Sequence, residues 1–262
     1  MRATIAYYDP PQRPGAGVRP DFTTLPLTGR PVTVSSMRAA GGGFSLDREG
    51  FTLAAAPTAV RDFYDRDEVS RRYVPETFEL VRSLTGCTAT ALLNNPVVRV
   101  SGRGGPRPAG TTFTGDFVHA DFSATAAADM VRRTLPPEEA ESRLRGPRFA
   151  VFNVWRTFSG PPQDMPLALC DTRSVMPDDK QYCEITLNEL TWENITYYHN
   201  QAHRWWYCPD MTRDEAYVFR SFDSAPGHAE QVPHSAFVNE SCPESAPPRA
   251  SIEVRVFAFF DG

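Results

Sequence analysis

Short runs of alternating apolar and polar residues dominate the chain after residue 87, which is the pattern of half-buried β-strands. Such runs predict strands over residues 88–100, 111–121, 149–158, 184–190, 196–198, 216–222 and 251–260. Helical spacing is confined to residues 60–73, 75–86 and 124–144, and Pro136 divides the last of these. Because no β-α-β alternation is present, the elements predict an antiparallel barrel or sandwich with helices packed outside it.

The first fifty residues are rich in proline and glycine. Prolines at positions 10, 11, 14, 20, 26 and 31 interrupt any helix, and three consecutive glycines at 41–43 mark a turn. We therefore expect residues 1–50 to form an arm that wraps the core. Since no linker separates the strands, residues 1–262 are predicted to form a single domain.

The last predicted strand has two contrasting faces. Its apolar positions are Ile252, Val254 and Val256, and its polar positions are Arg249, Ser251, Glu253 and Arg255. A cationic face on an inner strand needs an anionic partner, and the arginine fork suits a carboxylate. The hydroxyl of Ser251 would be a second donor. The alternative is a surface strand on which Glu253 pairs with Arg255 in solvent.

Histidine is scarce enough to limit the search for a metal site to five positions, namely His119, His199, His203, His228 and His234. Two-residue spacing places His119 and Asp121 on one face of a strand, with Phe117 beneath them. With a second, distant histidine this pair would form the facial triad that binds Fe(II). The alternative is a hydrogen-bonded pair at a strand end. The spacing leaves open which distant histidine completes the triad, and both His203 and His234 remain candidates.

The His-x-Asp pair, the distal His234 and the Arg-x-Ser of residues 249–251 resemble the signature of Fe(II)/2-oxoglutarate-dependent oxygenases. A set of blocks running in order from about residue 44 to the end resembles, more specifically, the AsaB/CmcJ-like hydroxylase/desaturase family. The blocks cover residues 73–76, 152–156, 166–171, 203–205, 220–224, 233–237 and 249–255.

This resemblance implies a mainly β fold with flanking helices around a double-stranded β-helix core, which is jelly-roll or cupin-like. It implies iron held by His119, Asp121 and His234, with 2-oxoglutarate and O2 as co-reactants. The residues expected to bind 2-oxoglutarate are Arg249, Ser251, Asn153, Arg156 and Arg255. Arg249 is favoured among the arginines because it begins the last strand. The aromatic residues expected to line the substrate pocket are Phe117, Trp155, Trp205 and Trp206.

The predicted activity is hydroxylation, desaturation or ring formation on a small molecule of secondary metabolism. One alternative is a metal oxygenase of the same fold that does not use 2-oxoglutarate. Another is a non-catalytic β-barrel that binds a small anion; iron uptake and succinate formation separate the three.

The composition of the chain limits the kinds of molecule that it is expected to bind. The net charge of −5 offers no basic field for nucleic acid, and no apolar run is long enough to span a membrane. The five cysteines are scattered, so we expect reduced thiols and a cytoplasmic protein. We expect a small-molecule substrate and allow for a homodimer.

Overall fold

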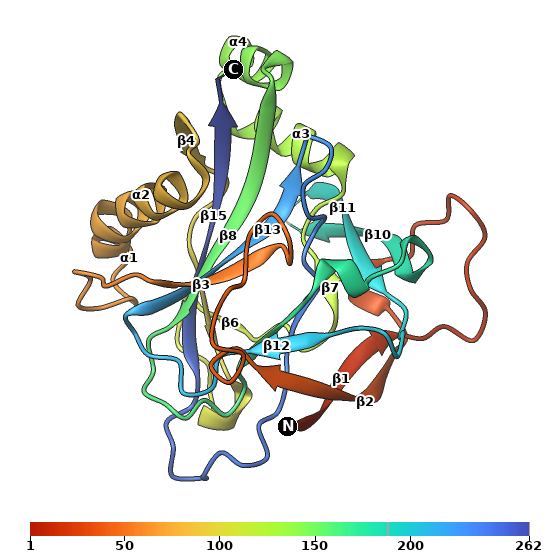
Figure 1. Cartoon of the computed structure of the whole chain (residues 1–262), viewed down its shortest axis with the longest axis vertical. Helices are drawn as coiled ribbons and strands as arrows, with labels where there is room; N and C mark the ends of the chain where they lie inside the picture. The colour runs from red at the N-terminus through yellow and green to blue at the C-terminus, as the bar shows by residue number, and fades with distance from the viewer. Residues whose placement is uncertain (188, 262) are drawn as a thin grey trace.

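Two β-sheets form the frame of the protein in the computed structural model, which describes residues 1–187 and 189–261. The first sheet has the strand order β1-β2-β12-β9-β14-β7-β11-β10. The second has the order β3-β13-β8-β15-β5-β6, and β4 also pairs with β15. The two sheets and the helices outside them are seen in Figure 1.

The strands of the two sheets have the following bounds. The first sheet contains β1 (Arg2–Tyr8), β2 (Leu27–Ser36), β7 (His119–Ala120), β9 (Leu167–Cys170), β10 (Lys180–Leu187), β11 (Leu190–Tyr197), β12 (Trp205–Tyr207) and β14 (His234–Ala236). The second contains β3 (Phe51–Ala55), β4 (Ala89–Leu92), β5 (Val97–Val100), β6 (Thr112–Phe113), β8 (Arg148–Thr157), β13 (Glu215–Asp223) and β15 (Ala250–Phe260).

The helices lie outside the sheets and stop where the sequence provides a terminator. They are α1 (Arg66–Glu68), α2 (Val74–Thr85), α3 (Ala124–Thr134) and α4 (Pro137–Arg145), with a π-helical turn over Val69–Tyr73. The predicted helix over residues 75–86 is confirmed as α2. Gly86 ends it in the left-handed conformation, with φ of 70°, which costs glycine no steric strain. Ser123 caps α3 by accepting a hydrogen bond from the amide of Ala126.

Strands β8 and β15 each have two buried faces. The face turned toward α2 is apolar except for Arg156, and it includes Val154, Ile252 and Val254 in one cluster with Val81 of α2. Residues of opposite parity on these strands face the first sheet. The predicted split of the last strand into an apolar and a polar face is therefore confirmed, and the polar face lies inside the protein.

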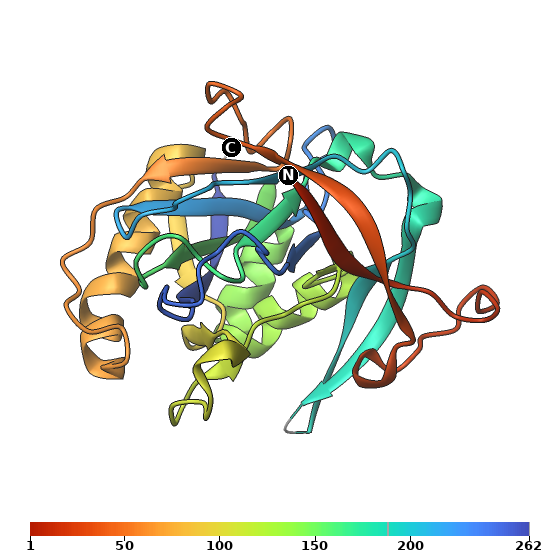
Figure 2. The same cartoon turned by 90° about the horizontal axis from the view of Figure 1, so that it is seen from below.

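The N-terminal residues contain two strands that the sequence pattern did not predict. Strand β1 pairs with β2, and β2 runs parallel to β12, so both belong to the first sheet. Pro31 fits because it lies outside the segment of β2 that pairs with β12, Val34–Ser36. Figure 2 shows the loop between β1 and β2 beside the β10–β11 hairpin, where the Glu184 amide donates to the Pro20 carbonyl.

Within residues 1–187 and 189–261, the structure has no helix long and apolar enough to cross a bilayer.

Candidate metal centre

His119 and His234 meet because their strands are neighbours. Strand β7 pairs antiparallel with β14, and these two residues lie directly opposite each other. Their ring centroids are 4.3 Å apart. Asp121 follows His119 by two residues, and one ligand atom from each of the three side chains lies within 4.8 Å of the others. The structure thus brings together three donors that are distant along the chain.

Both imidazoles are oriented by the backbone. The Nδ1 atoms of His119 and His234 lie 2.9 Å and 3.1 Å from the carbonyl oxygens of Phe117 and Val232. A carbonyl only accepts, so each Nδ1 must carry the proton and each Nε2 keeps its lone pair. Burial and the nearby His234 lower the pKa of His119 to about 4. Burial also lowers the pKa of His234. Both rings are therefore neutral at pH 7, which is the form that binds a metal.

Asp121 is held as a carboxylate. Burial would raise its pKa, but the Arg255 guanidinium, the two histidines and Asn153 outweigh burial and the net direction is downward. Arg255 donates from Nη2 to Oδ1 at 2.9 Å and from Nε to Oδ2 at 3.2 Å. The Asn153 amide donates to Oδ2 at 2.6 Å. Ser221 in turn donates to Asn153 Oδ1 at 2.8 Å.

The surroundings of the histidines are aromatic and tightly packed. The ring of Phe117 lies 5.2 Å from that of His119, and Phe22 of the N-terminal arm approaches the same imidazole at 5.9 Å. Phe219 lies 4.9 Å from His234. A Cβ atom at Gly115 would come within 3.2 Å of Cε1 of His119, so the close approach of this loop to the imidazole depends on glycine.

A cavity beside the triad holds the arginine that the sequence singled out. Its walls include His119, His234, Trp155, Arg99, Arg249 and Glu253. Arg249 is 1% exposed, and its Nη1 donates to the Met165 carbonyl at 2.6 Å. Its Nε has no hydrogen-bond partner among the described residues. Burial and the nearby Arg99 lower the pKa of Arg249 to about 9, which still leaves it charged at pH 7.

The residues present fit iron and 2-oxoglutarate. Two neutral imidazole nitrogens and one carboxylate are the donor set of the Fe(II) facial triad. A buried guanidinium with an unused donor suits the far carboxylate of a diacid. The first sheet therefore provides the candidate ligands. The second sheet provides Arg249, together with the groups that hold Asp121.

The four other residues expected to bind 2-oxoglutarate have different contacts. Asn153 and Arg255 point into the interior but contact Asp121. Ser251 is fully buried and donates to the Arg99 carbonyl at 3.4 Å. Arg156 faces α2, on the other side of the sheet. It donates to the Tyr73 hydroxyl at 2.9 Å and to two carbonyls, so the structure does not bring it to the cavity.

The expected aromatic pocket divides in two. Trp155 lines the cavity and Phe117 packs on His119. Trp205 lies elsewhere in the core, where its Nε1 donates to the Tyr7 hydroxyl at 2.8 Å. Trp206 packs against Phe44. His203, the other candidate ligand, bonds to Tyr7 and Asp179 and is not part of the triad.

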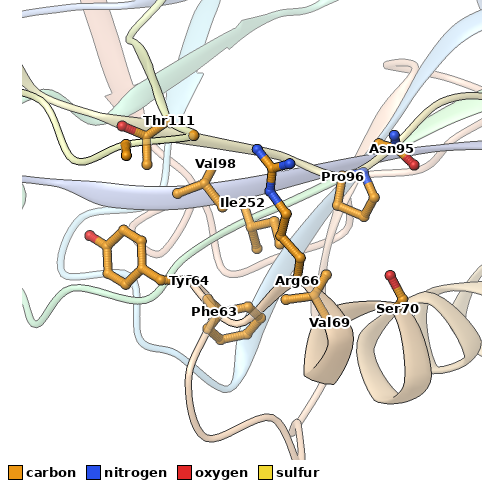
Figure 3. Close-up of a pocket in the computed structure, with 12 residues that line it drawn as sticks. Phe63, Tyr64, Arg66, Val69, Ser70, Asn95, Pro96, Val98, Thr111 and Ile252 are labelled. Atoms are coloured by element: carbon orange, nitrogen blue, oxygen red, sulfur yellow. The ribbon is translucent and has the colours of Figure 1, made fainter.

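A second cavity opens on the opposite face of β5 and β15 (Figure 3). Phe63 and Tyr64 form one side, Val98 and Ile252 contribute to the apolar part, and Arg66 projects toward Thr111. The described residues that line it include no histidine, cysteine or carboxylate. It therefore lacks the donors of a metal centre.

The sequence pattern missed three residues of the site. Arg99, Glu253 and Phe22 lie at the cavity or against His119. Glu253 shares the polar face of the last strand, so its spacing from Arg249 was an available signal. Nothing in the sequence identifies Arg99 or Phe22, because strand pairing and the course of the arm bring them there.

Within this jelly-roll core, the arrangement is that of a mononuclear non-haem iron oxygenase. Comparisons with known proteins agree. A family model described as "Oxidoreductase/YMDC permease-like domain" matches residues 5–259. The hydroxylase/desaturase CTB9 of Cercospora beticola is 32% identical, over 88% of this chain and 77% of its own length. The hydroxylase/desaturase efuI of Hormonema carpetanum is 29% identical over 91% of this chain and 86% of its own length.

Among solved structures, the iron and alpha-ketoglutarate-dependent endoperoxidase NvfI superposes with a TM-score of 0.87. The match covers 100% of this chain and 98% of that chain at 23% identity. It confirms the predicted fold. The chain belongs to the hydroxylase/desaturase family of Fe(II)/2-oxoglutarate-dependent oxygenases, as the sequence resemblance predicted.

Proposed function

We propose that His119, Asp121 and His234 bind Fe(II), and that Arg249 binds the far carboxylate of 2-oxoglutarate. The proposal rests on the convergence of two imidazoles and a carboxylate within 4.8 Å, beside a buried guanidinium with an unused donor. Three protein ligands leave positions open at the metal for 2-oxoglutarate and oxygen.

The side chains around the triad have separate tasks. Arg255 and Asn153 keep Asp121 ionised and fix its direction. The backbone carbonyls beneath the histidines set their tautomers. When bound, Fe(II) and 2-oxoglutarate would activate O2, which is the oxidant that removes hydrogen from a substrate C–H bond. The aromatic rings against the histidines, with Trp155, exclude water and confine the substrate.

We infer that the substrate is a small-molecule intermediate of secondary metabolism. Two relatives are named hydroxylase/desaturase and a third protein of the same fold is an endoperoxidase. All three outcomes begin with removal of substrate hydrogen, so the position of the substrate in the cavity would select between them. Hydroxylation or desaturation is the activity that we assign to this chain, with ring formation as a variant.

Succinate formation tests this function directly. Protein reconstituted with Fe(II) should convert 2-oxoglutarate to succinate in the presence of oxygen. Asp121→Ala should abolish the conversion, whereas His228→Gln, which changes a histidine outside the triad, should retain it. Iron uptake without succinate would favour a metal oxygenase that does not use 2-oxoglutarate. Absence of both would favour a binding module.

A further inference from the structure

A second arginine lies beside Arg249 in the cavity, and the proposed function gives it no task. Arg99 of β5 is directly opposite Ser251 of β15 in the antiparallel register. Side chains across such a pair lie on the same face, so Arg99 falls between Arg249 and Glu253. Burial is the largest cause of the lowered pKa of Arg249, His119 and His234, and the charge of Arg99 adds to the lowering at all three. Arg99 is therefore close to the metal position.

The guanidinium of Arg99 has no anionic partner among the described residues. Its Nη1 donates to the hydroxyl of Thr112 at 3.1 Å and to the carbonyl of Phe113 at 3.2 Å. Both acceptors are neutral, so the charge of Arg99 is not compensated locally. By contrast, Arg255 is paired with Asp121 and with Glu253, the latter at 2.5 Å.

The two unpaired arginines differ in depth. Arg249 is almost fully buried, whereas Arg99 is half-buried and its acceptors belong to β6, an edge strand of the second sheet. Phe113 is 50% exposed, which places this edge at the surface. Arg99 therefore lies nearer to solvent than Arg249 does.

The charges around the cavity leave room for one more anion. Arg99, Arg249 and Arg255 provide three positive charges, against two negative charges from Asp121 and Glu253. Asp164 also acts on Arg249, but its charge is paired with that of Arg103 at 3.4 Å. Fe(II) adds two positive charges and 2-oxoglutarate adds two negative charges, so one positive charge remains. A buried or half-buried charge without a partner is costly, and a ligand that neutralises it gains affinity.

We propose that Arg99 binds a carboxylate of the small-molecule substrate at the mouth of the cavity, while Arg249 holds 2-oxoglutarate in its depth. This inference rests on the proposed function, because it assumes that the deep position is occupied by the cosubstrate. It assigns the substrate to the class of organic acids and orients it with the acid group at the rim. The remainder of the molecule then extends toward Trp155 and the triad.

Binding measurements with a redox-inert metal test this assignment without turnover. The full chain is first saturated with Mn(II) and 2-oxoglutarate. Isothermal titration then compares a panel of aliphatic and aromatic monocarboxylic acids with the corresponding neutral amides. The wild type should prefer the acids. Arg99→Gln should reduce the preference by about 10- to 100-fold, the usual contribution of a charge-assisted hydrogen bond. Arg99→Lys should recover part of it.

Two matched variants separate this effect from a general loss of charge. Arg107→Gln removes a neighbouring cation, whose guanidinium lies 5.1 Å from the ring centroid of Phe113, and should leave the preference unchanged. Arg249→Gln should weaken 2-oxoglutarate, whereas Arg99→Gln should change its affinity less than twofold. Thermal denaturation confirms that each variant is folded.

The results that overturn the inference are distinct from those that overturn the proposed function. Equal binding of acids and amides by the wild type, or an acid preference that survives Arg99→Gln, would refute the role of Arg99. Loss of 2-oxoglutarate affinity in Arg99→Gln would make Arg99 a cosubstrate residue instead. Failure of the wild type to bind Mn(II) or 2-oxoglutarate at the first step would refute the proposed function itself.

Discussion

The sheet that contains β8 and β15 has a buried arginine on each face, and the two arginines have opposite surroundings. Arg156, 2% exposed, faces α2 and donates hydrogen bonds to the Tyr73 hydroxyl and to two backbone carbonyls. Arg249, 1% exposed, faces the metal centre and leaves its Nε without a partner among the described residues. The two arginines are therefore equally buried, but the hydrogen bonds of Arg156 are made within the protein, whereas Arg249 keeps a donor available for a ligand.

Iron uptake should show the largest difference between substitutions at the metal centre and substitutions on the α2 side of the sheet. His234→Ala or Asp121→Ala should reduce iron uptake from about one ion per chain to near zero, because two ligands cannot hold Fe(II) against water. Elemental analysis after anaerobic reconstitution measures this. The Arg156→Gln variant, changed on the face toward α2, should still bind iron in its folded fraction. Loss of iron in this variant would contradict the separation of the two faces.

The metal-free protein should lose stability in acid because His119 is neutral in the folded protein. The pKa of His119 is about 4 when folded, against an ordinary value near 6.5 when unfolded. Between these values the unfolded chain binds the extra proton, so the free energy of unfolding falls as pH drops from 6.5 to 4. His119 alone accounts for about 3 kcal/mol. Urea denaturation of His119→Gln should show a shallower pH dependence; an unchanged slope would contradict the burial of a neutral His119.

Arg156→Gln should act on stability. The change leaves two buried carbonyls and a buried hydroxyl short of a donor, which should lower the free energy of unfolding by about 3 kcal/mol. Its affinity for 2-oxoglutarate, measured on folded protein, should stay within twofold of the wild type. A tenfold weaker affinity would mean that Arg156 reaches the site.

Arg249→Gln should show the complementary result. Loss of a charge-assisted pair with the cosubstrate should weaken 2-oxoglutarate by about 10- to 100-fold while iron binding persists. Anaerobic titration of the weak visible charge-transfer band of the iron complex measures this affinity. Unchanged affinity would transfer the anchoring role to another cation, with Arg99 the nearest candidate.

The smallest effect should come from the outer contact to Asp121. Ser221 donates to Asn153 at 2.8 Å and, at 3.4 Å, to Asp121 itself, and Asn153 donates to Asp121. Ser221→Ala removes about 1 kcal/mol of this support, so iron affinity should fall about fivefold. A loss as large as that of Asp121→Ala would show that Ser221 does more than support Asp121 through these hydrogen bonds.

Much of this site follows from the sequence because strand periodicity is a local property. The two-residue spacing of His119 and Asp121, and of the charged positions on the last strand, predicted which side chains share a face. The same rule could have separated Asn153 from Arg156, since residues three apart on a strand face opposite ways. By this rule Arg156 belongs to the face opposite Asn153, and in the structure it contacts Tyr73 on the α2 side of the sheet.

Other features depend on long-range pairing and lie beyond such reasoning. Arg99 reaches the cavity because β5 pairs with β15, and no motif surrounds it. Trp205 and Trp206 lie on β12, between β2 and β9, and neither lines the cavity. Pro31 hid strand β2 from the sequence pattern, and the structure tolerates this proline because it lies outside the segment that pairs with β12.

The most direct test of the central claim is a crystal structure with Mn(II) in place of Fe(II) and with 2-oxoglutarate, using anomalous diffraction to locate the metal. One metal should lie about 2.0–2.2 Å from Nε2 of His119, an oxygen of Asp121 and Nε2 of His234. The far carboxylate of 2-oxoglutarate should contact Arg249. A metal bound elsewhere, or one that contacts only one of these three residues, would contradict the account.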